Sequence, residues 1–178
     1  MWRTVFNVLT VMATAGGLSG CGLTQTVADT SSAVTKAIFY KQVKTLHLDV
    51  VGRAAINTDV ADGRGLSVPT LVRVYQLRDG KALERLTYDD WLSNADRMLR
   101  DDLLSERTLV IKPDGAASLS MPMEEDTRVV AVVALLRAPD SQSNTWRLKL
   151  SRDDLDPDQA RVVELGDNRL ALRPRSKE

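Results

Sequence analysis

The residue with the most distinctive chemistry in this sequence is Cys21, the only cysteine of the chain. It directly follows Leu18, Ser19 and Gly20. Small residues before a cysteine let an extended backbone enter a peptidase groove, and the cysteine thiol can then carry a diacylglyceryl group. This pattern is typical of a bacterial lipobox and predicts a lipid anchor on Cys21. Because the chain has no second cysteine, it forms no internal disulfide.

The residues before Cys21 have the composition of a secretion signal. Residues 1–20 carry one charge, on Arg3, followed by mostly apolar or small residues from position 5 to position 18. Gly16 and Gly17 interrupt this stretch, which is shorter than the about 20 apolar residues of a spanning helix. We expect residues 1–20 to be a signal peptide that is removed. The best later apolar run, 129–136, is only as long as a strand, so we expect no transmembrane helix in the remainder.

The residues after the predicted cleavage site bear on where the protein resides. Gly22 stands where an aspartate would hold a lipoprotein in the inner membrane under enteric-type sorting, so we expect the outer membrane, with the chain facing the periplasm. Stable anchoring needs about two acyl chains, a condition that a triacylated Cys21 meets. Residues 21–44 begin with small and polar side chains and are predicted to be the tether.

The inventory of reactive side chains argues against an enzyme. The one histidine, His47, lies inside a predicted strand, and no serine stands in a G-x-S-x-G pattern. The acidic run 153–158 is the best calcium candidate, but it lacks the glycine and the terminal glutamate of an EF-hand, so we interpret it as a solvated loop. Trp91 and Trp146 could form a ligand platform, but their spacing favours a place in the core. We therefore predict no catalytic residues, no metal and no cofactor.

Composition and charge exclude two further classes of protein. Hydrophobic residues make up 43% of the chain and its formal net charge is zero. A nucleic-acid-binding surface needs a clustered basic excess, and a disordered chain is short of apolar residues. A folded domain without a nucleic-acid partner is the expectation.

The elements expected to carry the domain are mostly strands. Leu46, Leu48 and Val50 alternate with more polar residues, which predicts a half-buried strand from position 45. Residues 87–104 switch to a helical period, with Thr87 as the cap of one amphipathic helix. Further strands are expected at 68–77, 108–112, 116–121, 127–136, 144–150, 161–165 and 169–172, with hairpin turns at 113–115 and 166–168.

These elements predict a mainly β protein: a two-sheet antiparallel β-sandwich of about eight strands with one helix inserted between the second and third strands. The sandwich domain is expected to span residues 45–173, followed by a polar tail at 174–178. The run 127–136 lacks clean alternation, so it is expected to be a central strand buried on both faces.

Five blocks of sequence resemble the TssJ-type (VasD/Lip) outer-membrane lipoproteins of the bacterial type VI secretion system. They occur in the family's order: VRVYQL at 72–77, LRDDLL at 99–104, KPDG at 112–115, the strand ending VVALLR at 137, and NTWR at 144–147. The resemblance implies a transthyretin-like sandwich that binds the C-terminal periplasmic region of TssM, in a complex that also holds TssL. It further implies that the loop between the first two strands makes the contact.

In this sequence that loop is residues 57–67, which offer both charged and apolar side chains. The candidate partner-binding residues are Asn57, Thr58, Asp59, Val60, Ala61, Asp62, Gly63, Arg64, Gly65, Leu66 and Ser67. Two alternatives stay open at this stage. A lipoprotein that carries a small ligand or lipid would need an apolar cavity inside the sandwich, and a cell-wall hydrolase would need a catalytic pair of acids.

Overall fold

The computed structural model describes residues 43–59 and 65–175 of the chain. The predicted lipid site Cys21, the signal peptide, most of the tether, loop residues 60–64 and the last three residues lie outside this part. Within the described ranges, no helix has the length and apolar character needed to cross a bilayer.

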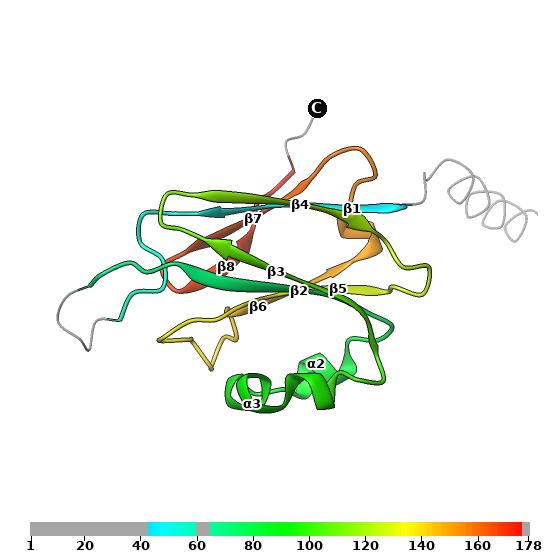
Figure 1. The fold of residues 1–178 in the computed structure, drawn as a ribbon, viewed down its shortest axis with the longest axis horizontal. Helices are drawn as coiled ribbons and strands as arrows, with labels where there is room; N and C mark the ends of the chain where they lie inside the picture. Colours follow the sequence, from blue (N-terminus) through cyan, green and yellow to red (C-terminus); the bar gives the residue numbers. More distant parts are fainter. Residues whose placement is uncertain (1–42, 60–64, 176–178) are drawn as a thin grey trace, which may run out of the picture. The chain divides into compact units, whose positions relative to one another are not determined.

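Eight strands form two four-stranded sheets that face each other (Figure 1). The sheets have the orders β4-β1-β7-β8 and β3-β2-β5-β6. The strands are β1 (Thr45–Gly52), β2 (Thr70–Leu77), β3 (Leu103–Ile111), β4 (Ala116–Pro122), β5 (Val129–Ala134), β6 (Arg147–Ser151), β7 (Arg161–Gly166) and β8 (Arg169–Leu172). The predicted mainly β, two-sheet sandwich is confirmed.

One strand pair departs from the antiparallel expectation. β1 and β7 run parallel, whereas every other neighbouring pair is antiparallel. β6 and β7 belong to different sheets, so the connection between them crosses the sandwich and passes through the short 3₁₀ helix η2 (Arg152–Asp154). A hairpin would have forced an antiparallel pair, but a crossing connection leaves the direction of β7 free to match β1.

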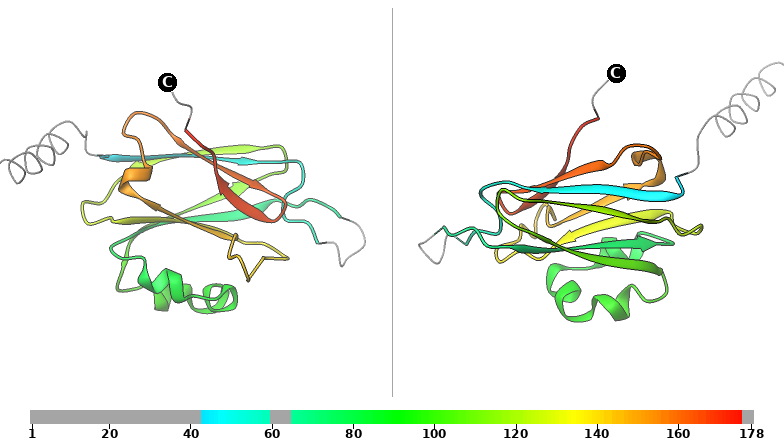
Figure 2. Two further views of the ribbon diagram at one scale, coloured as in Figure 1. Left: turned by 180° about the vertical axis from the view of Figure 1, so that it is seen from behind. Right: turned by 45° about the horizontal axis from the view of Figure 1, so that its top comes forward.

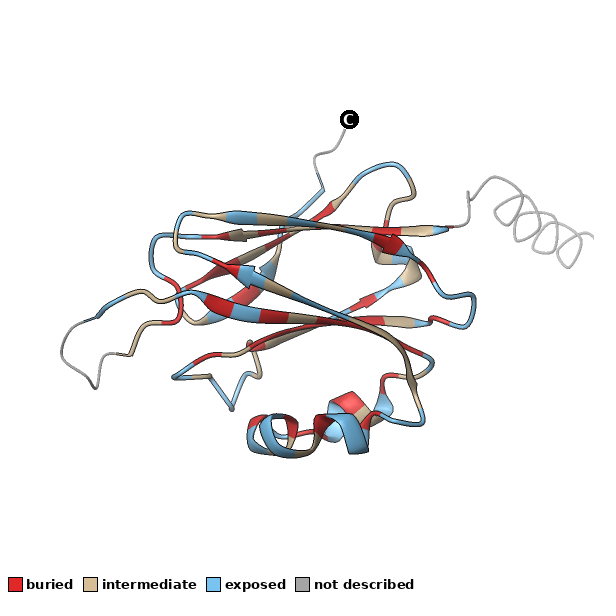
Figure 3. Ribbon diagram, viewed as in Figure 1, coloured by how far each residue is buried: buried red, intermediate tan, exposed pale blue. Residues whose placement is uncertain are grey.

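The alternation read from the sequence sets which side chains enter the core. Leu46, Leu48 and Val50 on β1 are fully buried, and the residues between them are half-buried. β5 is buried along nearly its whole length between β2 and β6, as its unbroken apolar run predicts. Figure 3 shows how the buried positions alternate along strands that have one exposed face.

Two helices lie against the outer face of the second sheet (Figure 2). They are α2 (Lys81–Arg85), which was not predicted, and α3 (Tyr88–Met98). Thr87 caps α3 as expected, since its side chain accepts a hydrogen bond from the Asp90 N–H. Because the helices cover this face, Tyr75 and Leu77 of β2 are buried along with the residues that face the other sheet.

The helix predicted over 87–104 is shorter than expected. α3 ends at Met98, with Leu99 as its C-cap, and the chain turns so that Leu103 pairs with Leu77 of β2. The last two residues of the predicted helix belong instead to β3. Pairing with β2 gives the backbone of β3 hydrogen bonds across the sheet in place of those of a longer helix. Two apolar residues of α3, Leu92 and Met98, are exposed.

The hairpin predicted at residues 113–115 is wrong. β3 pairs with β2 in one sheet and β4 pairs with β1 in the other, so residues 112–115 carry the chain from sheet to sheet. The positive φ that the turn needs falls on Asp114 (φ 55°) and not on Gly115. By contrast, the predicted hairpin between β7 and β8 is confirmed.

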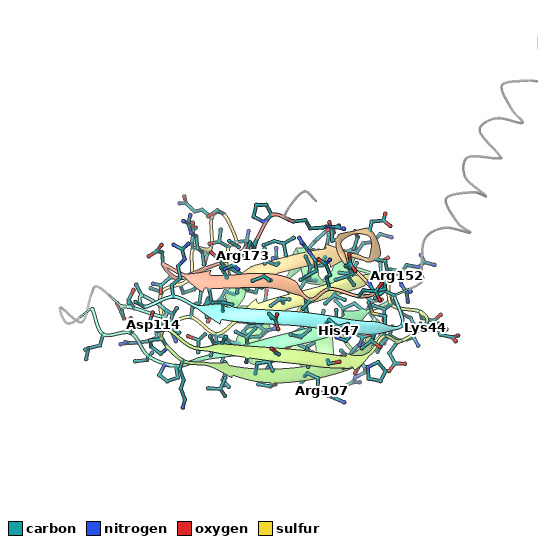
Figure 4. The ribbon with its side chains drawn as sticks, turned by 90° about the horizontal axis from the view of Figure 1, so that it is seen from above. Lys44, His47, Arg107, Asp114, Arg152 and Arg173 are labelled. Carbon is teal, nitrogen blue, oxygen red and sulfur yellow. The ribbon has the colours of Figure 1, made fainter. Side chains whose placement is uncertain are left out.

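The strand directions divide the sandwich into two ends. β1 begins with Thr45, directly after the first described residues 43–44, at an end of the sandwich that we call the entry end. The opposite end, which we call the loop end, holds the connections at 53–69, 112–115, 135–146 and 167–168. Lys44 and Asp114 mark these two ends in Figure 4. An eight-residue strand separates them by about 23 Å.

Candidate functional site

The loop between β1 and β2 is the longest connection at the loop end, and its first limb is held in place by side chains. Asn57 is only 5% exposed and has a positive φ of 49°. Its Nδ2 donates to the Leu135 carbonyl at 3.3 Å, and its Oδ1 accepts from the Arg137 N–H at 2.7 Å. Asn57 therefore ties the loop to the connection between β5 and β6.

The next residue of the loop is tied to the turn between β7 and β8. The Thr58 N–H donates to Asn168 Oδ1 at 2.9 Å, and Asn168 Nδ2 donates back to the Thr58 carbonyl at 2.7 Å. Asp167 and Asn168 both have positive φ, as a two-residue type I′ hairpin turn requires. The turn type thus aims the Asn168 amide at the loop.

The start of the loop also contacts the crossing between β3 and β4. The Gly52 N–H donates to the Gly115 carbonyl at 2.7 Å, and the Asp114 N–H donates to the Arg53 carbonyl at 3.2 Å. A Cβ on Gly52 would lie 2.6 Å from the Lys112 carbonyl oxygen, so a side chain at this position would push the crossing away.

The second limb of the loop is more open than the first. The Ser67 hydroxyl donates to the Ala54 carbonyl at 2.6 Å and so joins the two limbs. Beyond that bond, Gly65 is exposed with a positive φ of 54°, and Leu66 is 61% exposed. A large apolar side chain is therefore presented to solvent directly beside the part of the loop that lies outside the described residues.

Charges of both signs surround the loop. An Asp59 carboxylate oxygen lies 3.8 Å from Arg137 Nη2. A surface hollow of about 580 Å³ lies beside the loop, and the Asp140 carboxylate is among its polar lining groups. Hydrogen bonds from the Ser143 hydroxyl, and from the N–H groups of Ser143 and Gln142, hold the pKa of Asp140 below its ordinary value. This surface suits recognition of polar and charged groups.

The structure separates the predicted loop residues into three sets. Asn57, Thr58 and Asp59 form the first limb, and Gly65, Leu66 and Ser67 belong to the second. Val60, Ala61, Asp62, Gly63 and Arg64 lie outside the described residues, as does Cys21. Sequence reasoning missed Asn168 and Leu135, whose contacts with the loop join residues 110 and 78 positions apart.

The aromatic residues that were weighed as a ligand platform lie in the core. Trp91 and Trp146 are buried, and their ring centroids are 6.0 Å apart. The Trp91 Nε1–H donates to the Tyr75 hydroxyl at 3.2 Å, and the Tyr75–Trp91 contact joins α3 to β2. The prediction of a packing role is confirmed.

Within the described residues, the reactive side chains form no group that indicates catalysis or metal binding. His47 is a half-buried residue of β1 whose neighbour in the antiparallel register is Ser120. In residues 43–59 and 65–175, no group of three or more His, Cys, Asp or Glu side chains is arranged to hold a metal ion. The hollow of about 580 Å³ is an open surface feature with a mixed polar and apolar lining, unlike the enclosed apolar cavity that a lipid carrier would need.

Comparison with protein families gives a match that covers most of the chain. A protein-family model described as "Type VI secretion lipoprotein, VasD, EvfM, TssJ" matches residues 44–168. Among curated proteins, none matches the chain.

Solved structures with the same fold include three from type VI secretion. A chain described as "Type VI membrane complex" is 35% identical with a TM-score of 0.70, and the match covers 75% of this chain and 100% of that one. A chain in a structure described as "T6SS protein TssM C-terminal domain (869-1107) from EAEC" is 34% identical with a TM-score of 0.66 over 75% of this chain and 100% of that one. The lipoprotein TssJ1 from Pseudomonas aeruginosa is 23% identical with a TM-score of 0.58, covering 74% of this chain and 98% of that one, and its likeness speaks for the fold.

Proposed function

This chain belongs to the type VI secretion lipoprotein family, and from that premise we propose that it binds the C-terminal periplasmic region of TssM and anchors it to the outer membrane. The family is a structural subunit of the secretion system and not a family of enzymes. In the proposal, the lipid on Cys21 holds the sandwich at the membrane, the β1–β2 loop makes the contact, and TssL belongs to the same complex.

The observation that carries the proposal is the way the β1–β2 loop is held. Four hydrogen bonds of Asn57 and Thr58 fix its first limb to the sandwich, and a fifth, from Ser67 to Ala54, ties the second limb to the first. Its further residues supply both charge and apolar surface, including the exposed Leu66. A loop whose base is rigid loses little conformational entropy on binding, which favours affinity.

The direction of the sandwich agrees with a role between two membranes. The tether joins the domain at the entry end, and the loop lies about 23 Å away at the other end of β1. The predicted tether and the loop therefore leave the sandwich at opposite ends, so the lipid anchor and a partner bound at the loop do not compete for the same end. A chain similar to this one lies in a structure whose description names the TssM C-terminal domain, and this supports TssM as that partner.

The test is a binding measurement with the loop replaced. Residues 60–64 are exchanged for a Gly-Ser segment of equal length, which keeps the anchoring residues Asn57, Thr58 and Ser67. We expect this variant to lose at least about 100-fold in affinity for the purified periplasmic region of the cognate TssM, because loop residues supply the centre of the interface. Surface plasmon resonance on the lipidated full chain in detergent measures this change.

The matched control alters a loop of the same length at the entry end. Residues 156–160 are exchanged for the same Gly-Ser segment, and we expect the affinity for TssM to stay at the wild-type value. Wild-type affinity in the 60–64 variant would remove the loop from the interface, and no binding by the wild type would contradict the proposed partner.

A further inference from the structure

Five large apolar side chains are exposed in the described part of the chain, and they are unevenly placed. They are Leu66, Leu71, Leu92, Met98 and Val110. Single exposed apolar residues are ordinary on a protein surface, whereas a contiguous set marks an interaction site. Leu66, Leu71 and Val110 all lie at the loop end of the sandwich.

The strand register brings two of these residues side by side. Leu71 of β2 lies directly opposite Val110 of β3, and the two are 41% and 56% exposed. Opposite residues of an antiparallel pair point to the same face, with Cβ atoms about 5 Å apart. On the other side of β2, the Leu135 N–H donates to the Leu71 carbonyl at 2.8 Å, which continues the register beyond β5. Val110, Leu71 and the partly buried Leu135 form what we call the apolar row.

The helices leave the apolar row uncovered. The next outward-facing residue of β2 is Arg73, whose guanidinium lies 5.7 Å from the centre of the Trp91 ring on α3. The helical layer thus reaches Arg73, while Leu71, one step nearer to the loop end, stays exposed. β3 is an edge strand, so no further strand of the sheet lies beside Val110.

We propose that the apolar row is a second contact surface for the partner protein that binds the β1–β2 loop, and that this partner covers it with apolar side chains. This inference rests on the proposed function. The row adjoins the loop along the chain, because β2 follows the loop directly and Leu71 stands five residues after Leu66. Protein interfaces combine apolar and polar contacts. The row adds apolar contacts beside those of the loop, which we place at the centre of the interface.

The experiment makes the row more polar. The double variant Leu71→Thr/Val110→Thr places β-branched residues, which suit strands, at both positions. Full-length lipidated protein in detergent is tested against the purified periplasmic region of the cognate TssM. We expect the Kd to rise about ten-fold, because two half-exposed apolar side chains lose their burial in the complex. The urea midpoint is expected to stay at the wild-type value.

The matched control is Leu92→Gln on α3. Leu92 is 53% exposed, like the row residues, but it lies on a helix and not in the row. We expect its Kd to remain within about two-fold of the wild-type value. A Kd for the double variant that also stays within about two-fold would overturn the inference.

If the double variant folds poorly, a fluorescent label at position 110 tests whether the partner covers the apolar row. Val110→Cys carries an environment-sensitive fluorophore, and we expect its emission to shift to shorter wavelength when TssM is added. A label at Leu92→Cys is expected to show no shift. An unshifted Val110 label in a complex that has formed would overturn the inference.

The outcomes separate the two proposals. If the wild type does not bind TssM, both the proposed function and the apolar row fail. If the 60–64 variant loses binding but the row variant does not, the row alone fails. If the row variant only reduces self-association of the protein, the row is covered by a second copy of this chain, and the inference is again wrong.

Discussion

Substitution of Asn57 tests whether a buried side chain shapes the candidate binding loop. In Asn57→Ala, the Leu135 carbonyl and the Arg137 N–H lose their partners at 3.3 Å and 2.7 Å. Loss of these hydrogen bonds costs about 1–3 kcal/mol, and an alanine at a φ of 49° adds about 1 kcal/mol. Arg137 is exposed, so water can replace part of what is lost. We therefore expect the free energy of unfolding to fall by about 2 kcal/mol.

A comparison of Asn57→Gly with Asn57→Ala separates the loss of the hydrogen bonds from the strain of the positive φ. Glycine adopts positive φ without strain, so Asn57→Gly loses the side-chain bonds alone. We expect Asn57→Gly to be about 1 kcal/mol more stable than Asn57→Ala, which corresponds to about 4 °C in melting temperature. Urea unfolding followed by Trp91 and Trp146 fluorescence measures both values, since both residues are buried.

The hydrogen bonds of Asn57 and its positive φ are tested by separate outcomes. If both variants stay within about 0.5 kcal/mol of the wild type, the hydrogen bonds of Asn57 do not stabilise the loop base. If Asn57→Ala is as stable as Asn57→Gly, the positive φ carries no cost. Because the Asn57 side chain is buried, weaker binding of TssM by Asn57→Ala would report a displaced loop and not a lost contact.

Three further predictions concern the core, the acid limit and the anchor. Gln76 is fully buried and forms hydrogen bonds with the Pro122 carbonyl, the Glu124 N–H and the Thr127 hydroxyl, each at 2.8 Å. We expect Gln76→Leu to lower the free energy of unfolding, measured in urea, by about 2–4 kcal/mol. A loss below about 1 kcal/mol would contradict this prediction. Hydrogen bonds from the Ser151 N–H and hydroxyl lower the pKa of the Asp154 carboxyl, so its contribution is present above about pH 4 and is lost as the pH falls through the lower folded pKa. Thermal melts should therefore fall more steeply below about pH 4 for the wild type than for Asp154→Asn, and equal slopes would speak against the capping role. Cys21→Ser should leave the signal uncleaved by the lipoprotein peptidase and remove the protein from the outer-membrane fraction, whereas normal fractionation would disprove the lipid anchor.

The sequence by itself determined the features that depend on neighbouring residues. The alternation of Leu46, Leu48 and Val50 predicted β1 and its buried face. Thr87 predicted where α3 begins, and the residues around Asp167 predicted the turn between β7 and β8. These patterns suffice because a strand face, a helix cap and a tight turn are each set by a few residues close together in the chain.

Only the tertiary structure decided which strands pair and what the loop contacts. The residues at 113–115 suit a hairpin as well as a crossing between sheets. The crossing forms because β3 pairs with β2 in one sheet and β4 pairs with β1 in the other. The apolar spacing around Leu103 fits a helix, yet pairing with Leu77 makes it part of β3. In the sequence, Asn57 is an ordinary polar loop residue. Its hydrogen-bond partners lie 78 and 80 positions away and become visible only in the folded chain. Such contacts depend on how the whole chain folds back on itself, so no local pattern contains them.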